Sequence, residues 1–160
     1  MKIVKPTEDQ KKLAKKLAKE MGSIKNSITK GEGNAAGFLA EIVVADLLGA
    51  QKKSTKDYDL ITKEGKTVDV KTKRTNVPPK SYYECSIAKT SLHQNCDYYV
   101  FTRCLPDGTL YILGDFEQDA YFVKARKLEK GQQDGDNNFI VKADCFNLPI
   151  SELTNELCLL

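Results

Sequence analysis

The chain has 160 residues, of which 41% are hydrophobic and 29% charged, so its composition is that of one ordinary globular domain. No apolar run approaches the roughly 20 residues of a transmembrane helix, and residues 1–12 lack the apolar segment of a secretion signal. We therefore expect a cytoplasmic protein with no membrane partner. The net charge of +3 is unevenly distributed, because residues 1–80 carry 18 basic and 10 acidic side chains and residues 81–160 carry 7 and 12. The basic half favours a polyanionic partner.

Cysteine usage fits the same compartment. The chain has five cysteines, an odd number without CxxC spacing, and one histidine, His93. This pattern argues against a disulfide framework and against a zinc site. We expect the cysteines to be reduced and mostly buried.

Helical patterns dominate the first 50 residues. Residues 7–22 predict a helix that Thr7 caps and Gly22 ends, with leucines at a spacing of four. Residues 23–34 are polar and glycine-bearing, which is typical of a connection. Residues 35–49 predict a second helix, apolar nearly all round and therefore buried, with Asn34 as its cap.

Strand patterns dominate the rest of the chain. Two alternating segments flank the turn 63–66 and predict a hairpin. Further strands, a short turn or helix, a late helix, a loop, and a tail with a strand and a terminal helix follow. Such an order predicts an α/β or α+β domain with a mixed sheet packed against helices. The ranges are 57–62 and 67–74 for the hairpin, 82–88, 97–104 and 109–116 for strands, 89–95 for the short turn, 117–131 for the helix, 132–138 for the loop, and 139–143 and 151–157 for the tail.

The hairpin brings acidic side chains together. With the turn at residues 63–66, Asp59 lies opposite Asp69 or next to it, and opposed Cβ atoms are about 5 Å apart. Two carboxylates this close repel each other unless a cation lies between them, and carboxylate oxygens suit Mg²⁺. Lys71 shares a strand face with Asp69, so its ammonium reaches the same place.

The acid-x-Lys element alone carries little information, because it occurs three times in the chain. Residues 9–11 fall in a predicted helix, and residues 64–66 fall in a turn. Only residues 69–71 lie on a strand that has a second acid on the neighbouring strand. This context singles out Asp69 and Lys71.

A third acid, Glu41, stands among apolar residues of the predicted helix 35–49. A glutamate on a buried helix is costly unless it is paired or bound to a metal ion. Two interpretations of Glu41 remain open. Its carboxylate binds a metal ion, or it is paired with a lysine or lies at the rim of the helix.

The segments "GFLAE" on a helix, "YDL" on a strand and "DVK" on the next strand resemble the PD-(D/E)XK nuclease superfamily. Its restriction-endonuclease-like fold is shared by restriction enzymes, Holliday-junction resolvases and many phage and repair nucleases. "CDYYVFTRC" and "TLYILGDF" resemble later core strands, and "FVKARKLEKG" resembles the closing helix. The resemblance implies a nuclease core at residues 34–130. A basic helix and connection at 1–33 would precede it and an extension at 131–160 would follow, all within one domain.

The resemblance also implies a role for each residue of the cluster. Glu41 would assist metal or water binding, and Asp59 would be a metal ligand. Asp69 would be a second ligand, joined by the backbone carbonyl of Val70. Lys71 would be the catalytic lysine.

The assignment of Asp59 has one rival. Tyr58 stands where many members of the superfamily have a proline, a common departure. Asp57 shares the strand face of Asp59, but the register across the turn favours Asp59.

Candidate substrate contacts come from the basic half and from one glutamine. In many such nucleases a glutamine or lysine after the third core strand touches substrate or water, and Gln94 is the candidate, although the position is more typical of an ordinary polar loop residue. His93 beside it is a candidate proton carrier, although a lone histidine in a loop is more often incidental. Lysine contacts to phosphate would position DNA without reading its sequence and would depend on salt. The candidates are Lys52, Lys53, Lys56, Lys73, Arg74, Lys80 and Tyr82, with Lys11, Lys12, Lys15, Lys16 and Lys19 as a further, or merely solvated, basic face.

The sequence thus predicts a Mg²⁺- or Mn²⁺-dependent DNA endonuclease of phage or bacterial type, acting as a homodimer because two symmetric sites cut two strands most easily. A Holliday-junction resolvase or another structure-selective nuclease is the alternative within the fold. A non-catalytic nucleic-acid-binding module is a second alternative. A small interaction protein is a third, in which the acids and the lysine do not converge.

Overall fold

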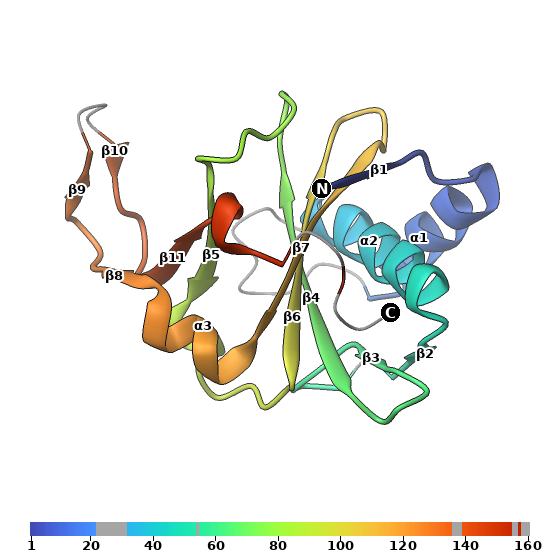
Figure 1. Cartoon of the computed structure of the whole chain (residues 1–160). Helices are drawn as coiled ribbons and strands as arrows, with labels where there is room; N and C mark the ends of the chain where they lie inside the picture. The colour runs from blue at the N-terminus through green and yellow to red at the C-terminus, as the bar shows by residue number, and fades with distance from the viewer. Residues whose placement is uncertain (22–31, 54, 136–138, 155–156, 158–160) are drawn as a thin grey trace.

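The computed structural model describes residues 1–21, 32–53, 55–135, 139–154 and 157. They form a mixed α/β structure around a curved six-stranded sheet (Figure 1). Strands β4 and β6 are parallel, and all other neighbours in this sheet are antiparallel. In spatial order the strands are β1 (Lys2–Val4), β7 (Leu110–Glu117), β6 (Tyr98–Cys104), β4 (Thr67–Arg74), β3 (Leu60–Ile61) and β2 (Gln51–Lys52).

Two helices cover one face of the central sheet, α1 (Glu8–Met21) and α2 (Glu32–Leu48) (Figure 1). Buried side chains of α2 pack against the valines of β4, so the first core forms between them. The expectation that the second helix is buried is confirmed, because its apolar residues from Ala36 to Leu48 are almost all buried.

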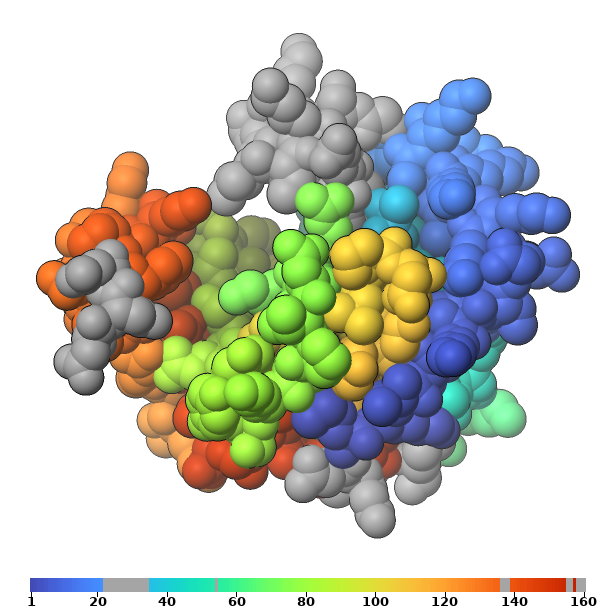
Figure 2. Space-filling model, turned by 90° about the horizontal axis from the view of Figure 1, so that it is seen from above, coloured from blue at the N-terminus to red at the C-terminus, as the bar shows by residue number. Residues whose placement is uncertain are grey.

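The other face carries α3 (Gln118–Lys124) and a three-stranded sheet in the order β5 (Glu84–Ala88), β11 (Cys145–Pro149), β8 (Arg126–Leu128). Tyr99 and Phe101 of β6 pack there with Tyr121 of α3 in a second core. The hairpin of β9 (Gln133–Asp134) and β10 (Phe139–Ile140) extends away from the rest (Figure 1). Seen from above, this orange hairpin lies on the side opposite the blue N-terminal residues (Figure 2).

The start of the first helix follows its sequence signal. The Thr7 amide donates to Gln10 Oε1 at 2.9 Å, and the Gln10 amide donates to Thr7 Oγ1 at 3.2 Å. These reciprocal bonds satisfy amides that the first helical turn leaves without partners. Gly22 and most of the expected connection lie outside the described residues. Helix α2 begins at Glu32, so Asn34 lies inside the helix rather than at its cap.

The late helix is shorter than the sequence predicts. It ends at Lys124, and Arg126–Leu128 forms β8 instead of the second half of a helix. The Arg126 guanidinium donates to both carboxylate oxygens of Glu84, at 2.7 and 2.6 Å, and to Asp134. These contacts and the pairing of β8 with β11 override the helical pattern, which is a local preference worth only tenths of a kcal/mol per residue.

The other differences from the expected secondary structure concern short elements. Strands β1 and β2 are not expected from the sequence, and β9 lies in the expected loop 132–138. The start of the expected terminal helix is a short 3-10 helix at Ile150–Glu152, while residues 155–156 lie outside the described part. Residues after 130 contribute β11, which pairs with both β5 and β8.

Two findings concern the expectations drawn from hydrophobicity and from the cysteines. No helix among the described residues is long and apolar enough to cross a membrane. Cys85, Cys96 and Cys104 are free and buried, and Cys145 is free and half-buried, as expected. Cys158 lies outside the described residues.

Asp97 ties the start of β6 to the start of β4, and we expect Asp97→Ala to lower the free energy of unfolding by about 1–3 kcal/mol. Its carboxylate accepts hydrogen bonds from the Thr67 amide at 2.7 Å and the Thr67 hydroxyl at 2.8 Å. The bond from the Thr67 amide lowers the pKa of Asp97 in the fold. This stabilisation is therefore complete above about pH 4 and is lost as pH falls through the lower folded pKa.

Urea denaturation at pH 7 measures this effect. Lys66→Ala is the matched control, because it removes only a 4.0 Å ion pair of Asp97. A loose, exposed pair contributes less than about 1 kcal/mol. Equal losses in the two variants would contradict the role given to the Thr67 bonds.

Candidate active site

The centre of the candidate site is β4, whose residues alternate between the two cores. Val68 and Val70 face α2, while Asp69 and Lys71 face the other side of the sheet. Asp69 is only 5% exposed, so this half of the strand is buried on both faces rather than on one. The Lys71 ammonium lies 2.6 Å from Asp69 Oδ2 and compensates its charge.

Asp59 reaches the same place from the neighbouring segment. Strands β3 and β4 pair Leu60 with Val68, and this register, extended by one residue, sets Asp59 opposite Asp69. Asp59 Oδ2 accepts a hydrogen bond from the Val70 amide at 2.8 Å. The expected convergence of the two aspartates is thus confirmed.

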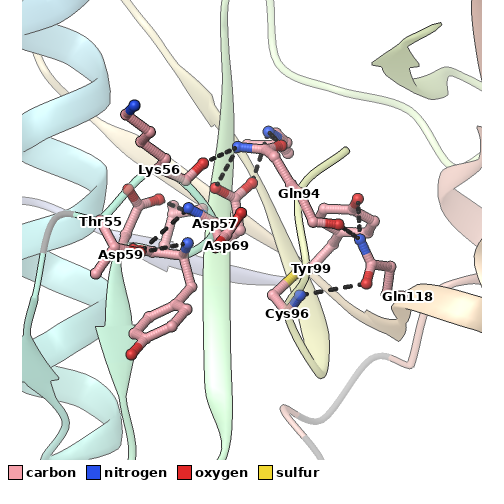
Figure 3. Close-up of polar contacts among 12 residues, drawn as sticks. Thr55, Lys56, Asp57, Asp59, Asp69, Gln94, Cys96, Tyr99 and Gln118 are labelled. Atoms are coloured by element: carbon pink, nitrogen blue, oxygen red, sulfur yellow. Dashed lines mark hydrogen bonds and ion pairs between the residues drawn. The ribbon is translucent and has the colours of Figure 1, made fainter. Parts of the chain in front are cut away.

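The rival acid lies in a different environment. Asp57 sits in a bend that Thr55 organises, with the Asp57 amide donating to Thr55 Oγ1 at 3.2 Å (Figure 3). The carboxylate that accepts a hydrogen bond from the β4 backbone is that of Asp59. The structure therefore favours Asp59 over Asp57 as the acid that faces Asp69.

Glu41 projects from α2 and is paired with a lysine, one of the two alternatives that its sequence context allows. Lys52 Nζ of β2 lies 2.7 Å from Glu41 Oε2 and 4.6 Å from the centre of the Phe38 ring. The Glu41 side chain is 14% exposed. Lys52 is therefore part of the site rather than of an outer basic rim.

The three acids share one poorly solvated region. Burial, with the nearby charges of Asp69 and Glu41, raises the pKa of Asp59 to about 7. Burial also raises the pKa of Glu41, with the charge of Asp69 adding to the effect and Lys52 opposing it. The carboxylates thus repel one another although two of them have lysine partners, and a further cation would relieve the repulsion.

The described residues include no group of three histidine, cysteine, aspartate or glutamate side chains arranged to hold a metal ion as it stands. Each acid instead contacts a group of the protein itself. The donor set nevertheless fits a hard divalent cation, because carboxylate oxygens are its preferred ligands. Glu41 Oε2 and Asp69 Oδ2 are buried against ammonium groups, which are the kind of counter-charge that such a cation replaces.

Gln94 lies in the loop before β6 and bridges the acid and the lysine. Its Oε1 accepts from Lys71 Nζ at 2.8 Å, and its Nε2 lies 3.4 Å from both Asp69 Oδ1 and the Lys56 carbonyl (Figure 3). The structure therefore brings this candidate into contact with the cluster. Neighbouring His93 is exposed.

Gln118 is a residue of the site that sequence reasoning missed. Its Nε2 donates to the Gln94 carbonyl at 2.7 Å and to the Tyr99 hydroxyl at 2.9 Å, and its Oε1 accepts from the Cys96 amide (Figure 3). It fixes the loop that carries Gln94. The Tyr99 ring also lies 5.7 Å from Lys71 Nζ. The sequence holds no motif that joins these positions.

The remaining basic candidates separate into two faces. Lys73 follows Lys71 on the same face of β4, whereas Arg74 points to the opposite face and lines a hollow of about 270 Å³ with Lys11 and Lys15. The sequence predicts that Lys73 and Arg74 extend the site along β4 together. In the structure only Lys73 lies on the face of the site. The helix lysines Lys12, Lys16 and Lys19 lie outside the residues that line this hollow.

Other candidates are exposed near the site or on the following loop. The Lys53 amide donates to the Asp59 carbonyl at 2.7 Å, and Lys56 accepts from Gln94 through its carbonyl. Lys80 and Tyr82 are exposed after β4, with Lys80 Nζ 5.7 Å from the Tyr82 ring. These side chains are exposed, and contact with DNA stays a prediction for each.

No known protein family model matches the chain, and no curated protein is significantly similar to it. The chemistry is therefore argued from the geometry. Three carboxylates, two ammonium groups and one amide converge from helix α2, the segment before β3, strands β2 and β4, and the loop before β6. Such a set can bind a divalent cation and stabilise negative charge that develops on a phosphate.

Proposed function

We propose that the protein is a metal-dependent DNA endonuclease of the PD-(D/E)XK superfamily with a restriction-endonuclease-like fold. The observation that carries the proposal is the convergence of Glu41 from α2, Asp59 before β3, and Asp69 and Lys71 on β4. These are the acids and the lysine that the resemblance requires. Glu41 lies on a helix and Asp69 and Lys71 on a strand, as expected, whereas Asp59 lies in a bend just before β3. A mixed sheet between helices agrees with such a fold.

Glu41, Asp59 and Asp69 would hold the cation, with the carbonyl of Val70 as a further ligand. When bound, Mg²⁺ or Mn²⁺ supplies an activated water and positive charge against the phosphate. The hydrogen bond from the Val70 amide fixes the Asp59 carboxylate against β4. The buried strand thus orients two carboxylates before any ligand arrives.

Lys71 would orient the attacking water and stabilise the negative charge of the phosphorane. Asp69 and Gln94 hold its ammonium at 2.6 and 2.8 Å, so the charge is positioned in advance. The expected partners are DNA and a second copy of the chain, which would give one site for each strand of a duplex. The exposed side chains of Lys53, Lys56 and Lys80 are proposed contacts to the DNA backbone.

Incubation of the protein with linear, circular, four-way-branched and single-stranded DNA tests the proposal. Each substrate is combined with Mg²⁺, Mn²⁺ or EDTA, and Asp59→Asn is run beside the wild type. We expect cleavage only by the wild type with a metal ion. Cleavage restricted to the branched DNA would identify a structure-selective nuclease. Binding without cleavage under every condition would overturn the proposal in favour of a non-catalytic module.

We expect Gln94→Leu to lower the cleavage rate by roughly 10- to 100-fold, the usual cost of losing a residue that orients a catalytic group. The change removes the bond to Lys71 Nζ and the contact with Asp69 at similar volume. Single-turnover cleavage with Mg²⁺ measures the effect. Gln132→Leu, on the turn before β9, is the control. A Gln94→Leu rate equal to that of the control would show that the amide has no part in the reaction.

A further inference from the structure

A cleft of about 300 Å³ continues the site along β4, between the central sheet and β5. Lys71, Lys73 and Arg103 line it, and so does Glu84. In the parallel register of β4 and β6, Lys73 pairs with Arg103. Directly paired residues lie on the same face of a sheet, so two cations stand side by side in this cleft.

Arg103 is an unusual residue for a buried position. It is 5% exposed, and its guanidinium donates to the Glu84 carbonyl at 3.1 Å and lies 5.2 Å from the Tyr83 ring. The Glu84 carboxylate is taken by Arg126. Among the described residues, Arg103 therefore has a carbonyl and a ring as partners, and no carboxylate forms an ion pair with it.

Lys73 is exposed, and the acid whose charge reaches it is Glu84, which Arg126 already holds. No side-chain hydrogen bond or ion pair of Lys73 is present in the described part of the chain. Burial and the charge of Arg103 lower the pKa of Lys73, and burial lowers the pKa of Arg103. The Cys85 thiol, which also lines the cleft, has its pKa raised to about 12 by burial, so it stays neutral and supplies no counter-charge. Arg103 is thus a buried cation that no carboxylate pairs with, and it lies beside the exposed Lys73, so an anionic ligand in the cleft would compensate a charge that is costly to bury alone.

The position of the cleft indicates which anion fits. Lys71 and Lys73 are two residues apart on one strand, about 7 Å along it. That distance is comparable with the separation of successive phosphates along a nucleic-acid strand. Arg and Lys together offer the bidentate and point-charge donors that phosphate oxygens accept.

We propose that the cleft is a phosphate-binding subsite, in which Lys73 and Arg103 hold the phosphate next to the one that Lys71 meets. The identity of the ligand as a nucleic-acid strand rests on the proposed function. The preference for a phosphate rests on the two cations and the cleft alone. The phosphate is either internal to a strand or a terminal 5′ phosphate.

The test measures binding of a fluorescent single-stranded oligonucleotide by anisotropy in EDTA, where no cleavage occurs. The oligonucleotide is used with a 5′ phosphate and with a 5′ hydroxyl, across a range of salt. We expect Lys73→Met to weaken binding about 10-fold and to lower the slope of log affinity against log salt by about 1. A loss with both oligonucleotides identifies an internal phosphate, and a loss with the phosphorylated one alone identifies a terminal phosphate.

Two further variants keep the result interpretable. Lys127→Met, on the exposed surface of β8, is the control for removal of a positive charge. Arg103→Lys keeps the charge of the buried residue but loses the guanidinium fork, and thermal unfolding reports whether it folds. Affinity and salt slope of Lys73→Met equal to those of Lys127→Met would overturn the subsite. If Lys73→Met lowers the salt slope but the wild-type protein cuts no DNA, the proposed function is refuted and the subsite is retained.

Discussion

Replacing Lys71 with methionine is expected to slow DNA cleavage by roughly 10²–10⁴-fold, the range for losing a positioned charge or proton-transfer group. Methionine keeps the apolar stem of the side chain, which lies in a strand buried at this point. It removes the ammonium that Asp69 and Gln94 hold at 2.6 and 2.8 Å. Folding should persist, because a bound cation can take over the charge of Asp69.

Single-turnover rates at saturating protein measure this effect separately from binding. Lys127→Met is the control, because its lysine is equally charged but exposed on β8. DNA affinity in EDTA should change much less for Lys71→Met than the cleavage rate does. A Lys71→Met rate within about twofold of the control would remove the lysine from the reaction.

Gly114→Ala is expected to lower the free energy of unfolding by roughly 3–5 kcal/mol, at the upper end of single substitutions. Gly114 lies in β7 at φ +146°, a conformation that side chains rarely adopt. An added Cβ would approach the Thr154 carbonyl oxygen to 2.3 Å and Leu153 Cβ to 2.9 Å. Because Thr154 exchanges backbone hydrogen bonds with Asp115, the clash would displace the C-terminal segment from the sheet.

Gly65→Ala separates the effect of the steric clash from the effect of the positive φ. Gly65 also has a positive φ, of +81°, but no atom lies within 4 Å of an added Cβ there. Its substitution should cost only about 1 kcal/mol. Urea denaturation of both variants measures the difference. Similar losses at the two glycines would show that the C-terminal segment yields easily and does not hold β7.

Local patterns predict the long elements of the fold well. The capped helix at Thr7, the buried helix around Glu41 and the alternating β4 each carry their own signal over many residues. Short strands fail because they depend on pairing partners that are distant in the sequence, as β8 shows through the bonds from Arg126 to Glu84 and Asp134. Such contacts outweigh a helical pattern of moderate strength.

In the candidate site, too, local spacing predicts some residues and tertiary packing determines others. Asp59, Asp69 and Lys71 could be found because a hairpin register and a strand face follow from local spacing. The pairing of Lys52 with Glu41 and the bridge from Gln118 to the Gln94 loop could not, because each joins elements through tertiary packing. Sequence spacing therefore locates the acids and the lysine of the candidate site but not the residues that position them.

The measurement that tests the central claim most directly compares wild type with Asp69→Asn in a DNA cleavage assay, with Mg²⁺ and with EDTA. Asparagine keeps the shape of the buried side chain and removes its charge. If the acids and Lys71 form a metal-dependent hydrolytic site, wild type cuts DNA with Mg²⁺ only, and Asp69→Asn is slower by at least about 10²-fold. Equal cleavage by the two proteins, or cleavage by wild type in EDTA, would contradict the account.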